Sequence, residues 1–381
     1  MKKRISFILA AILILFAALT AVSCGRENGE PAASSEVVSA EDPYAEESSG
    51  EESSETVSAE VLSTEEGSSE DDSEEVSAED SSTEEDPGTI VTPPEENPIS
   101  PLLWRVTDAD GHKLYLFGTI HVGDERNDTV LEKIVPVLDA CDALAVEFDV
   151  VAYESNLEQM VKDLMQYVLL DGSVVSDYLP EDLYQRSYEL LEQANMTPAA
   201  FTRYNLAWWA QMVESAMMVV YSDLKAEKAM DSLLIGHAYE KGMPVLEVES
   251  SSFQMGLLNG FDNELYRLQI EEALESADIY GSELNQLYSL WLSGDREAFW
   301  TSIYGAEQYT GDYSEEQLAL LEEYNRQLLD ERNIGMRDRA IEYLASGDTV
   351  FFAVGSAHMA GDVGLVQLLS EAGYTVEEIS Y

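Results

Sequence analysis

The chain has 381 residues and a formal net charge of −55, from 75 acidic and 20 basic residues. The segment 27–96 holds 25 of these acids, which leaves 50 acids and 16 bases, a net charge of −34, for the C-terminal part of the chain. Such a surface repels phosphate groups and argues against nucleic-acid partners. Cysteine occurs only at Cys24 and Cys141, which excludes a CxxC metal or redox site. Cys141 lies among apolar residues and is expected to be a buried thiol.

The N-terminus has the pattern of a secretory signal. Basic residues 2–4 precede an apolar run at 5–22, and small residues lead to Cys24. This ending resembles a bacterial lipobox, which predicts cleavage after residue 23 and lipidation of Cys24, although Ala21 replaces the usual Leu. An uncleaved signal anchor is the alternative, because about 18 apolar residues could just span a bilayer. Both interpretations place the protein at the cell membrane, outside the cytoplasm.

Residues 24–98 form an acidic segment rich in Ser and Glu. No Lys or Arg occurs between Arg26 and Arg105, and the only aromatic residue of this segment is Tyr44. Such a composition cannot bury enough apolar surface to offset the entropy of ordering, and its like charges repel one another. We expect a disordered tether.

Residues 99–381 are long enough for one domain with a substantial core. The segments 103–107 and 113–117 read as strands joined by an Asp-Gly turn at 108–111. Further strands are expected at 143–149, 244–249, 349–354 and 374–379, and helices at 127–140, 155–240, 263–346 and 361–372. This order predicts an α/β fold, with a central mixed β-sheet from two related half-domains and a large helical insertion at about 155–240 and 255–345. The large apolar residues of the insertion, among them Trp208, Trp209, Met217, Met218 and Tyr221, are expected to lie mostly in the core.

Two segments with matching motifs indicate that the domain consists of two related halves. Gly118-Thr119-Ile120-His121 and Gly355-Ser356-Ala357-His358 each follow an apolar strand and precede a Gly-Asp pair. Each motif places a histidine just past the carboxyl end of a strand, where open α/β sheets bind ligands. The remaining histidines, His112 and His237, are expected to lie in a solvated turn and to pack on a helix.

Carboxylates complete a possible site. Glu147 and Asp149 would share one face of a strand by the period-two rule, and Glu247 with Glu249 repeats the pattern. Two histidines with one or two carboxylates suit a divalent metal such as Mn, Co, Fe or Zn. Such a metal would acidify a bound water for attack on a carbonyl. The alternative is an ion-pair network without metal.

The order GTIH, VEFD and GSAH resembles the TraB/GumN family, whose relatives include the metal-requiring Tiki proteases. Further matching positions are Met230-Asp231-Ser232, Glu249 with Gln254, Glu331-Arg332-Asn333 and Gly373-Tyr374-Thr375-Val376.

The resemblance implies roles for individual residues. His121 and His358 would be metal-binding or catalytic histidines, and Glu147 would be a metal ligand or general base. Arg332 would hold substrate charge or polarise a carbonyl, with pairing to the domain's acids as the alternative. Glu249 is a weaker candidate ligand. Asp231 is assigned no more than a helix cap.

The resemblance also implies a function. We expect a metal-dependent hydrolase, a peptidase, acting on peptides or secreted proteins at the cell surface. Two alternatives stay open: a non-catalytic protein that sequesters peptides, as in relatives implicated in pheromone shutdown, and a haem- or metal-binding protein.

Overall fold

The computed structural model describes residues 99–304 and 313–381. The predicted signal peptide, the lipidation site at Cys24 and the acidic tether lie outside these residues. Within the described ranges, no helix has both the length and the apolar character needed to cross a bilayer.

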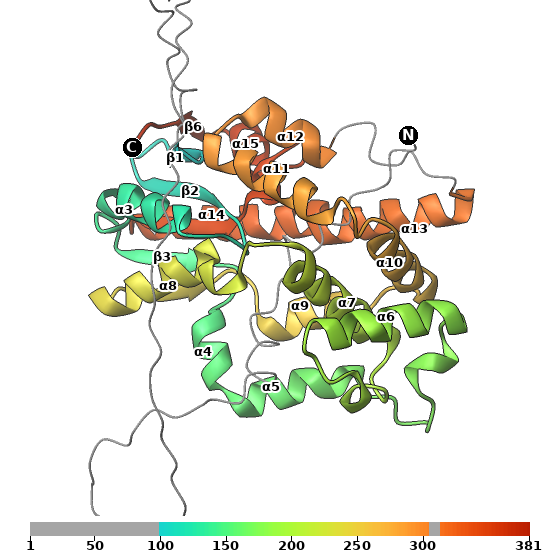
Figure 1. Ribbon diagram of the computed structural model, residues 1–381. Helices are drawn as coiled ribbons and strands as arrows, with labels where there is room; N and C mark the ends of the chain where they lie inside the picture. The colour runs from blue at the N-terminus through green and yellow to red at the C-terminus, as the bar shows by residue number, and fades with distance from the viewer. Residues whose placement is uncertain (1–98, 305–312) are drawn as a thin grey trace, which may run out of the picture. The chain divides into compact units, whose positions relative to one another are not determined.

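A six-stranded mixed sheet forms the centre of the fold (Figure 1). Its strand order is β4-β3-β5-β2-β1-β6. Strands β2 to β5 run parallel to one another, whereas β1 is antiparallel to both β2 and β6. The bounds are β1 Leu103–Thr107, β2 Lys113–Thr119, β3 Ala143–Val146, β4 Val245–Glu247, β5 Val350–Gly355 and β6 Thr375–Glu378. The predicted α/β class and mixed sheet are confirmed.

The sequence of β5 explains its central position. All six residues of Val350–Gly355 are buried, as expected of a parallel strand that is covered on both faces. Strands β2 and β3 flank it, so the two strands that precede the GxxH-type motifs are neighbours. The β1–β2 hairpin turns at Gly111, whose φ of 90° lies in the region that glycine tolerates best.

Helices cover both faces of the sheet. On one face, α8 packs against β3 and α3 packs against α8, with Ile134 and Ile235 in the same apolar cluster as Leu144. On the other face, α14 and α15 bury Met336 and Leu365 beside the sheet. The bounds are α3 Arg126–Leu138, α8 Met230–Lys241, α14 Arg332–Ser346 and α15 Leu365–Glu371.

The helical insertion comprises α4 Val150–Ser155, α5 Leu157–Leu164, α6 Glu181–Gln193, α7 Leu206–Tyr221, α9 Ser251–Leu258, α10 Asn263–Glu275, α11 Tyr280–Ser293, α12 Arg296–Tyr304 and α13 Glu315–Asn325. Most of these helices lie below or to the right of the sheet in Figure 1. Helices α11 and α12 instead lie at the top of the view near β1 and β6, where Arg296 of α12 pairs with Glu378 of β6.

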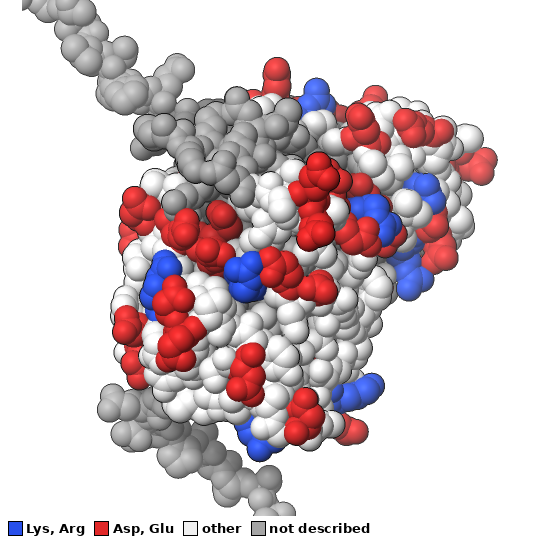
Figure 2. All heavy atoms as spheres, turned by 90° about the vertical axis from the view of Figure 1, so that its right-hand side faces the viewer, with Lys and Arg blue, Asp and Glu red and all other residues white. Residues whose placement is uncertain are grey.

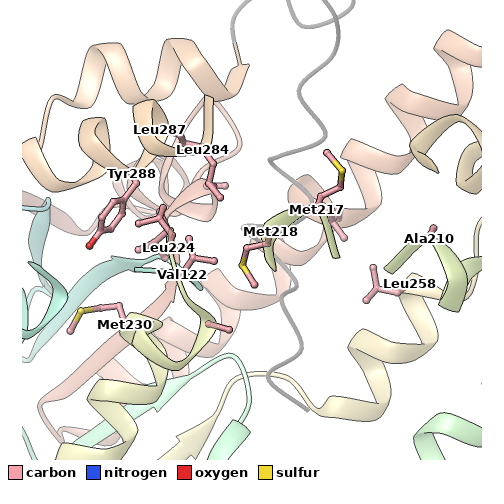
Figure 3. Packing of buried hydrophobic residues seen from close by; sticks show 14 of the residues in the cluster. Val122, Ala210, Met217, Met218, Leu224, Met230, Leu258, Leu284, Leu287 and Tyr288 are labelled. Atoms are coloured by element: carbon pink, nitrogen blue, oxygen red, sulfur yellow. The ribbon is translucent and has the colours of Figure 1, made fainter. Parts of the chain in front are cut away.

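Helix α7 is the apolar centre of the insertion. Trp208, Trp209, Met217 and Met218 are buried, as predicted, whereas Tyr221 at the end of the helix is 38% exposed. Figure 3 shows Met217 and Met218 among the buried side chains that also include Val122 and Leu284. The apolar core is therefore continuous from the end of β2 into the insertion.

One strand is shorter than the sequence predicts. Strand β3 ends at Val146, so Glu147 and Asp149 do not share a strand face. Asp149 instead caps α4, where its carboxylate accepts the Ala152 N–H at 2.9 Å. The prediction of a period-two carboxylate pair was wrong, because the strand gives way to a helix cap after Val146.

The acidic surface and the burial of Cys141 agree with what the composition predicts. Figure 2 shows a face on which Asp and Glu clearly outnumber Lys and Arg. Cys141 is buried and free, and burial raises the pKa of its thiol to about 12. The predicted buried thiol is confirmed.

Candidate functional site

The two histidine motifs meet because their strands are adjacent. Thr119 at the end of β2 pairs in register with Gly355 at the end of β5. The approach is close at Gly118, where an added Cβ would come within 2.9 Å of the Ser356 Cα. Glycine at position 118 therefore lets the backbone segments after β2 and β5 leave the sheet side by side.

His121 is held by a carboxylate from α8. Its Nδ1 lies 2.7 Å from an oxygen of Asp231, whose other oxygen accepts the Thr119 hydroxyl at 2.6 Å. A carboxylate can only accept here, so Nδ1 carries the proton. The Nε2 atom is buried and has no hydrogen-bond partner within the described ranges.

His358 has a similar arrangement with a different partner. Its Nδ1 lies 2.6 Å from Oδ1 of Asn333 on α14, and the Asn333 amide nitrogen donates to the Val363 carbonyl at 2.9 Å. This second bond fixes the amide, so Nδ1 of His358 is the donor and Nε2 keeps its lone pair. In the part of the chain that the structure describes, this buried Nε2 has no hydrogen-bond partner either. It lies 3.8 Å from Oε1 of Glu147.

Glu147 is the centre of a buried charged cluster. Its Oε2 accepts from Arg332 at 2.6 Å and from Gln254 at 2.8 Å, and its Oε1 accepts the Gly355 N–H at 2.8 Å. Arg332 also bonds Glu249 through Nη2 at 2.7 Å and Nε at 2.9 Å. Gln254 bridges the two carboxylates by donating to Glu249 at 2.8 Å. One guanidinium and one amide therefore hold two carboxylates side by side.

These surroundings set opposite protonation states on the two histidines. Burial alone would lower the pKa of His121, but Asp231 and Glu147 raise it to about 9. Burial and the Arg332 charge together lower the pKa of His358 to about 3. Burial alone would raise the pKa of Glu147, but Arg332 and the two histidines hold it well below its ordinary value. Near neutral pH the site therefore contains an imidazolium, a neutral imidazole and a carboxylate.

A π-helical segment, Arg326–Glu331, joins α13 to α14 directly before two of these residues. Arg332 contacts Glu147 and the next residue, Asn333, contacts His358. Arg332 also donates to the Leu328 carbonyl within this segment at 3.2 Å. Such departures from α-helical geometry are frequent at functional sites.

The structure brings together His121, His358, Glu147, Arg332 and Glu249. Arg332 is 4% exposed and bonded to both acids, as the ion-pair alternative anticipated; a contact with substrate stays a prediction. Glu247 lies apart at the end of β4, where it accepts the N–H of Asp149 at 3.0 Å.

Sequence reasoning missed the residues that orient the histidines. Asp231 makes no capping bond at the start of α8 and contacts His121 instead. Asn333 and Gln254 were given no role of their own. The available signal was that all three lie in segments matching the family pattern, but nothing local indicates which distant side chain each contacts.

The donor atoms fit the expected metal in part. Both Nε2 atoms lack a hydrogen-bond partner among the described residues, and both Nδ1 atoms are held by hydrogen bonds, which is how ligating histidines are normally oriented. In residues 99–304 and 313–381, however, no group of three or more His, Cys, Asp or Glu side chains is arranged to hold a metal ion. The metal therefore stays a prediction.

Fold and site together define an α/β protein with two histidines whose Nε2 atoms are buried, beside a carboxylate–arginine cluster at the carboxyl ends of parallel strands. The chain belongs to the TraB/PrgY/gumN family, which it matches over residues 102–378. It is similar to uncharacterized protein YbaP of Escherichia coli (strain K12), with 23% identity over 268 residues, 69% of this chain and 90% of that protein. YbaP of Shigella flexneri is 23% identical over 259 residues, 67% of this chain and 87% of that protein. No solved structure matches the chain.

Proposed function

We propose that this protein is a metal-dependent hydrolase, a peptidase, which acts on peptides or secreted proteins outside the cytoplasm. The observation that carries the proposal is the pair of histidines with buried Nε2 atoms, each with Nδ1 bonded and Nε2 unpaired within the described residues, next to one ionised carboxylate. An unpaired polar atom in a protein interior is costly, so its presence at two matched positions favours a ligand.

His121 Nε2, His358 Nε2 and Glu147 would hold the ion, because Mn, Co, Fe and Zn accept imidazole nitrogen and carboxylate oxygen. When bound, such an ion supplies Lewis-acid chemistry and acidifies water. Binding requires His121 to lose the proton that its pKa of about 9 retains near neutral pH.

The chain's own residues position the reacting groups. Asp231 and Asn333 fix the orientation of the two imidazoles. Arg332 and Gln254 keep Glu147 ionised and hold its Oε2, while Oε1 faces His358. Glu147 would use Oε1 either to ligate the ion or, where it does not ligate it, to accept a proton from the attacking water as a general base does.

The test is hydrolysis of a peptide library by the purified chain, freed of metal and then supplied with Mn, Co, Fe or Zn in turn. We expect cleavage that depends on metal and is lost in His121→Ala and in His358→Ala. The matched control is His237→Ala. His237 lies on α8, pairs with Asp139 at the end of α3 and is outside the cluster. No cleavage with any of these metals, or equal cleavage by all variants, contradicts the proposal.

Peptide sequestration without cleavage is a second candidate. It is favoured by the pairing of Arg332 with both Glu147 and Glu249, because the guanidinium is already engaged and is not left to polarise a substrate carbonyl. The same experiment separates the two candidates, because a sequestering protein retains the peptides intact.

We also propose that Cys24 carries a lipid anchor that holds the protein at the cell membrane. The sequence pattern around Cys24 supports this part of the proposal. Replacing Cys24 with Ser should move the protein out of the membrane fraction, and an unchanged distribution would favour an uncleaved signal anchor.

A further inference from the structure

Helix α11 of the insertion contacts the loop that carries His121 at both of its ends. This loop, residues 118–127, begins at the end of β2 and reaches the first turn of α3. Trp291 bonds the start of the loop and Tyr288 bonds its end. The two rings are stacked, with centroids 5.9 Å apart and planes 14° apart. Tyr288 belongs to the same buried cluster as Val122 of the loop (Figure 3).

Trp291 holds the backbone where the loop starts. Its indole N–H donates to the carbonyl of Gly118 at 2.8 Å in the protein interior. Its ring also packs edge-on against Phe117, with centroids 6.3 Å apart. Gly118 is the first residue of the motif that ends in His121 and the point of close approach to Ser356. The indole bond therefore fixes the position from which the chain runs to the histidine.

Tyr288 holds the far end of the loop. Its hydroxyl donates to Oδ1 of Asn127 at 2.8 Å and accepts the N–H of Asp124 at 3.4 Å. The amide nitrogen of Asn127 donates to the Lys228 carbonyl at 2.7 Å. This second bond sets the orientation of the amide, so its oxygen faces the hydroxyl. Tyr288 therefore acts on the loop and, through Asn127, on the residues just before α8.

The packing at this end leaves little room for movement. A Cβ added at Gly123 would overlap the Asn127 amide and come within 2.8 Å of the Lys228 carbonyl oxygen, so only glycine fits there. Lys228 lies just before α8, the helix that carries Asp231, and Asp231 is the hydrogen-bond partner of His121. The bond from α11 to Asn127 therefore fixes the loop against the helix whose carboxylate orients the imidazole.

We propose that Trp291 and Tyr288 are positioning residues for His121, and that α11 thereby sets how Nε2 of this histidine is presented beside His358. The proposal rests on the proposed metal-dependent function, because it concerns how that site is assembled. Neither residue touches the imidazole, so each acts through the backbone of the loop. Such indirect control is effective because a misplacement of about 1 Å can cost on the order of a hundredfold in activity.

Two substitutions remove these bonds and leave aromatic rings in place: Trp291→Phe and Tyr288→Phe. Each should weaken binding of Zn and of Mn to the metal-free full chain at least about fivefold, because one imidazole is less well held. In the metal-free protein, each should also speed hydrogen exchange in peptides that cover residues 118–125. Calorimetric titration measures the first effect and exchange mass spectrometry measures the second.

The chain offers a matched control for each change. Trp209→Phe removes a buried indole bond to the Ser187 hydroxyl at 2.9 Å. Tyr266→Phe removes a hydroxyl that donates to the Leu258 carbonyl at 2.6 Å and accepts the Phe261 N–H at 2.9 Å. Both controls lie in the insertion and lose the same kind of bond. They should lose comparable stability in urea unfolding and leave the metal affinity and the exchange of residues 118–125 unchanged.

The two proposals fail in different ways. A wild-type chain that binds neither ion removes the metal site, and the exchange comparison then decides the role of α11 by itself. Faster exchange at 118–125 in the two variants but not in their controls supports the positioning role, and unchanged or equally raised exchange overturns it. If the wild type binds metal, equal affinities of the variants and their controls overturn the positioning role and keep the metal site.

Discussion

The two histidine motifs are alike in sequence and opposite in electrostatics. Both follow neighbouring parallel strands, and both imidazoles are held through Nδ1. His121 is held by the carboxylate of Asp231, which raises its pKa to about 9 against the effect of burial. His358 is held by the neutral amide of Asn333 and feels the charge of Arg332, so burial and that charge lower its pKa to about 3. The motif sets where the imidazole lies, and a partner from a distant helix sets its charge.

The largest loss of stability is expected on replacing Arg332, the cation that holds Glu147 and Glu249. Replacing it with Ala leaves Glu147 and Glu249 buried without a cation, which should cost about 3–5 kcal/mol of stability. It should also raise the pKa of His358, because the charge that lowers it is gone. Urea unfolding measures the first effect. The matched control is Arg339→Ala on the same helix, whose exposed pair with Glu342 should cost below about 1 kcal/mol; similar costs for the two variants would contradict the cluster.

A second comparison concerns Glu147 and Glu214, which have opposite pKa shifts. Glu214 on α7 is hydrogen-bonded by the Tyr280 hydroxyl at 3.0 Å, and burial raises its pKa from 4.5 to about 7. Because the pKa of Glu214 is raised in the folded state, this residue contributes its full stabilisation of the fold below about pH 4.5. That stabilisation is lost as the pH rises through about 7 and the carboxyl group ionises. Glu214→Gln should therefore be the more stable protein near pH 8, by on the order of 2 kcal/mol, and should lose this advantage near pH 4.5. Thermal unfolding across this range tests it, and a pH-independent difference would refute the raised pKa.

The next prediction removes the difference between the two histidine pKa values by changing the partner of His121. Asp231→Asn exchanges the carboxylate for an amide, as at His358, and should lower the pKa of His121 from about 9 to below neutrality. The stability loss should be about 1–2 kcal/mol, because the amide still accepts the hydrogen bond but the charge is lost. NMR titration of the metal-free protein measures the pKa. Asp139→Asn, at the exposed pair with His237, is the control and should cost below about 0.5 kcal/mol.

The smallest stability effect is expected for the converse change. Asn333→Asp places a carboxylate beside His358 and should raise its pKa by at least about one unit. Folding should change by only about 1 kcal/mol, because the new charge attraction offsets the cost of burying a carboxylate. The same NMR titration tests this, with Asn259→Asp, at a residue that bonds Asn205 in the insertion, as the control. An unchanged His358 pKa would show that its partner does not set its charge.

The positions of the main elements could be read from the sequence because the signals are local. Apolar runs marked β2, β3 and β5, and the repeated motif placed His121 and His358 at the same edge of the sheet. Adjacent parallel strands present their carboxyl ends together, so the meeting of the two histidines followed from topology.

The partners of the histidines could not be read in the same way. Asp231 and Asn333 are distant in sequence from the histidines that they hold, and no local pattern encodes that contact. The prediction that Glu147 and Asp149 share a strand face was wrong for a related reason. Side chains alternate with a period of two only while the strand continues, and β3 ends at Val146. The π-helical segment before Arg332 likewise has no signature in the apolar spacing.

The most direct test of the central claim is calorimetric titration of Mn or Zn into the purified, metal-free chain in two buffers with different ionisation enthalpies. The paired-histidine account predicts one ion per chain with release of about one proton, supplied by His121, and no binding in the double variant His121→Ala, His358→Ala. Equal binding by the wild type and the double variant, or no binding by the folded wild type, would contradict the claim that these two imidazoles form a metal site.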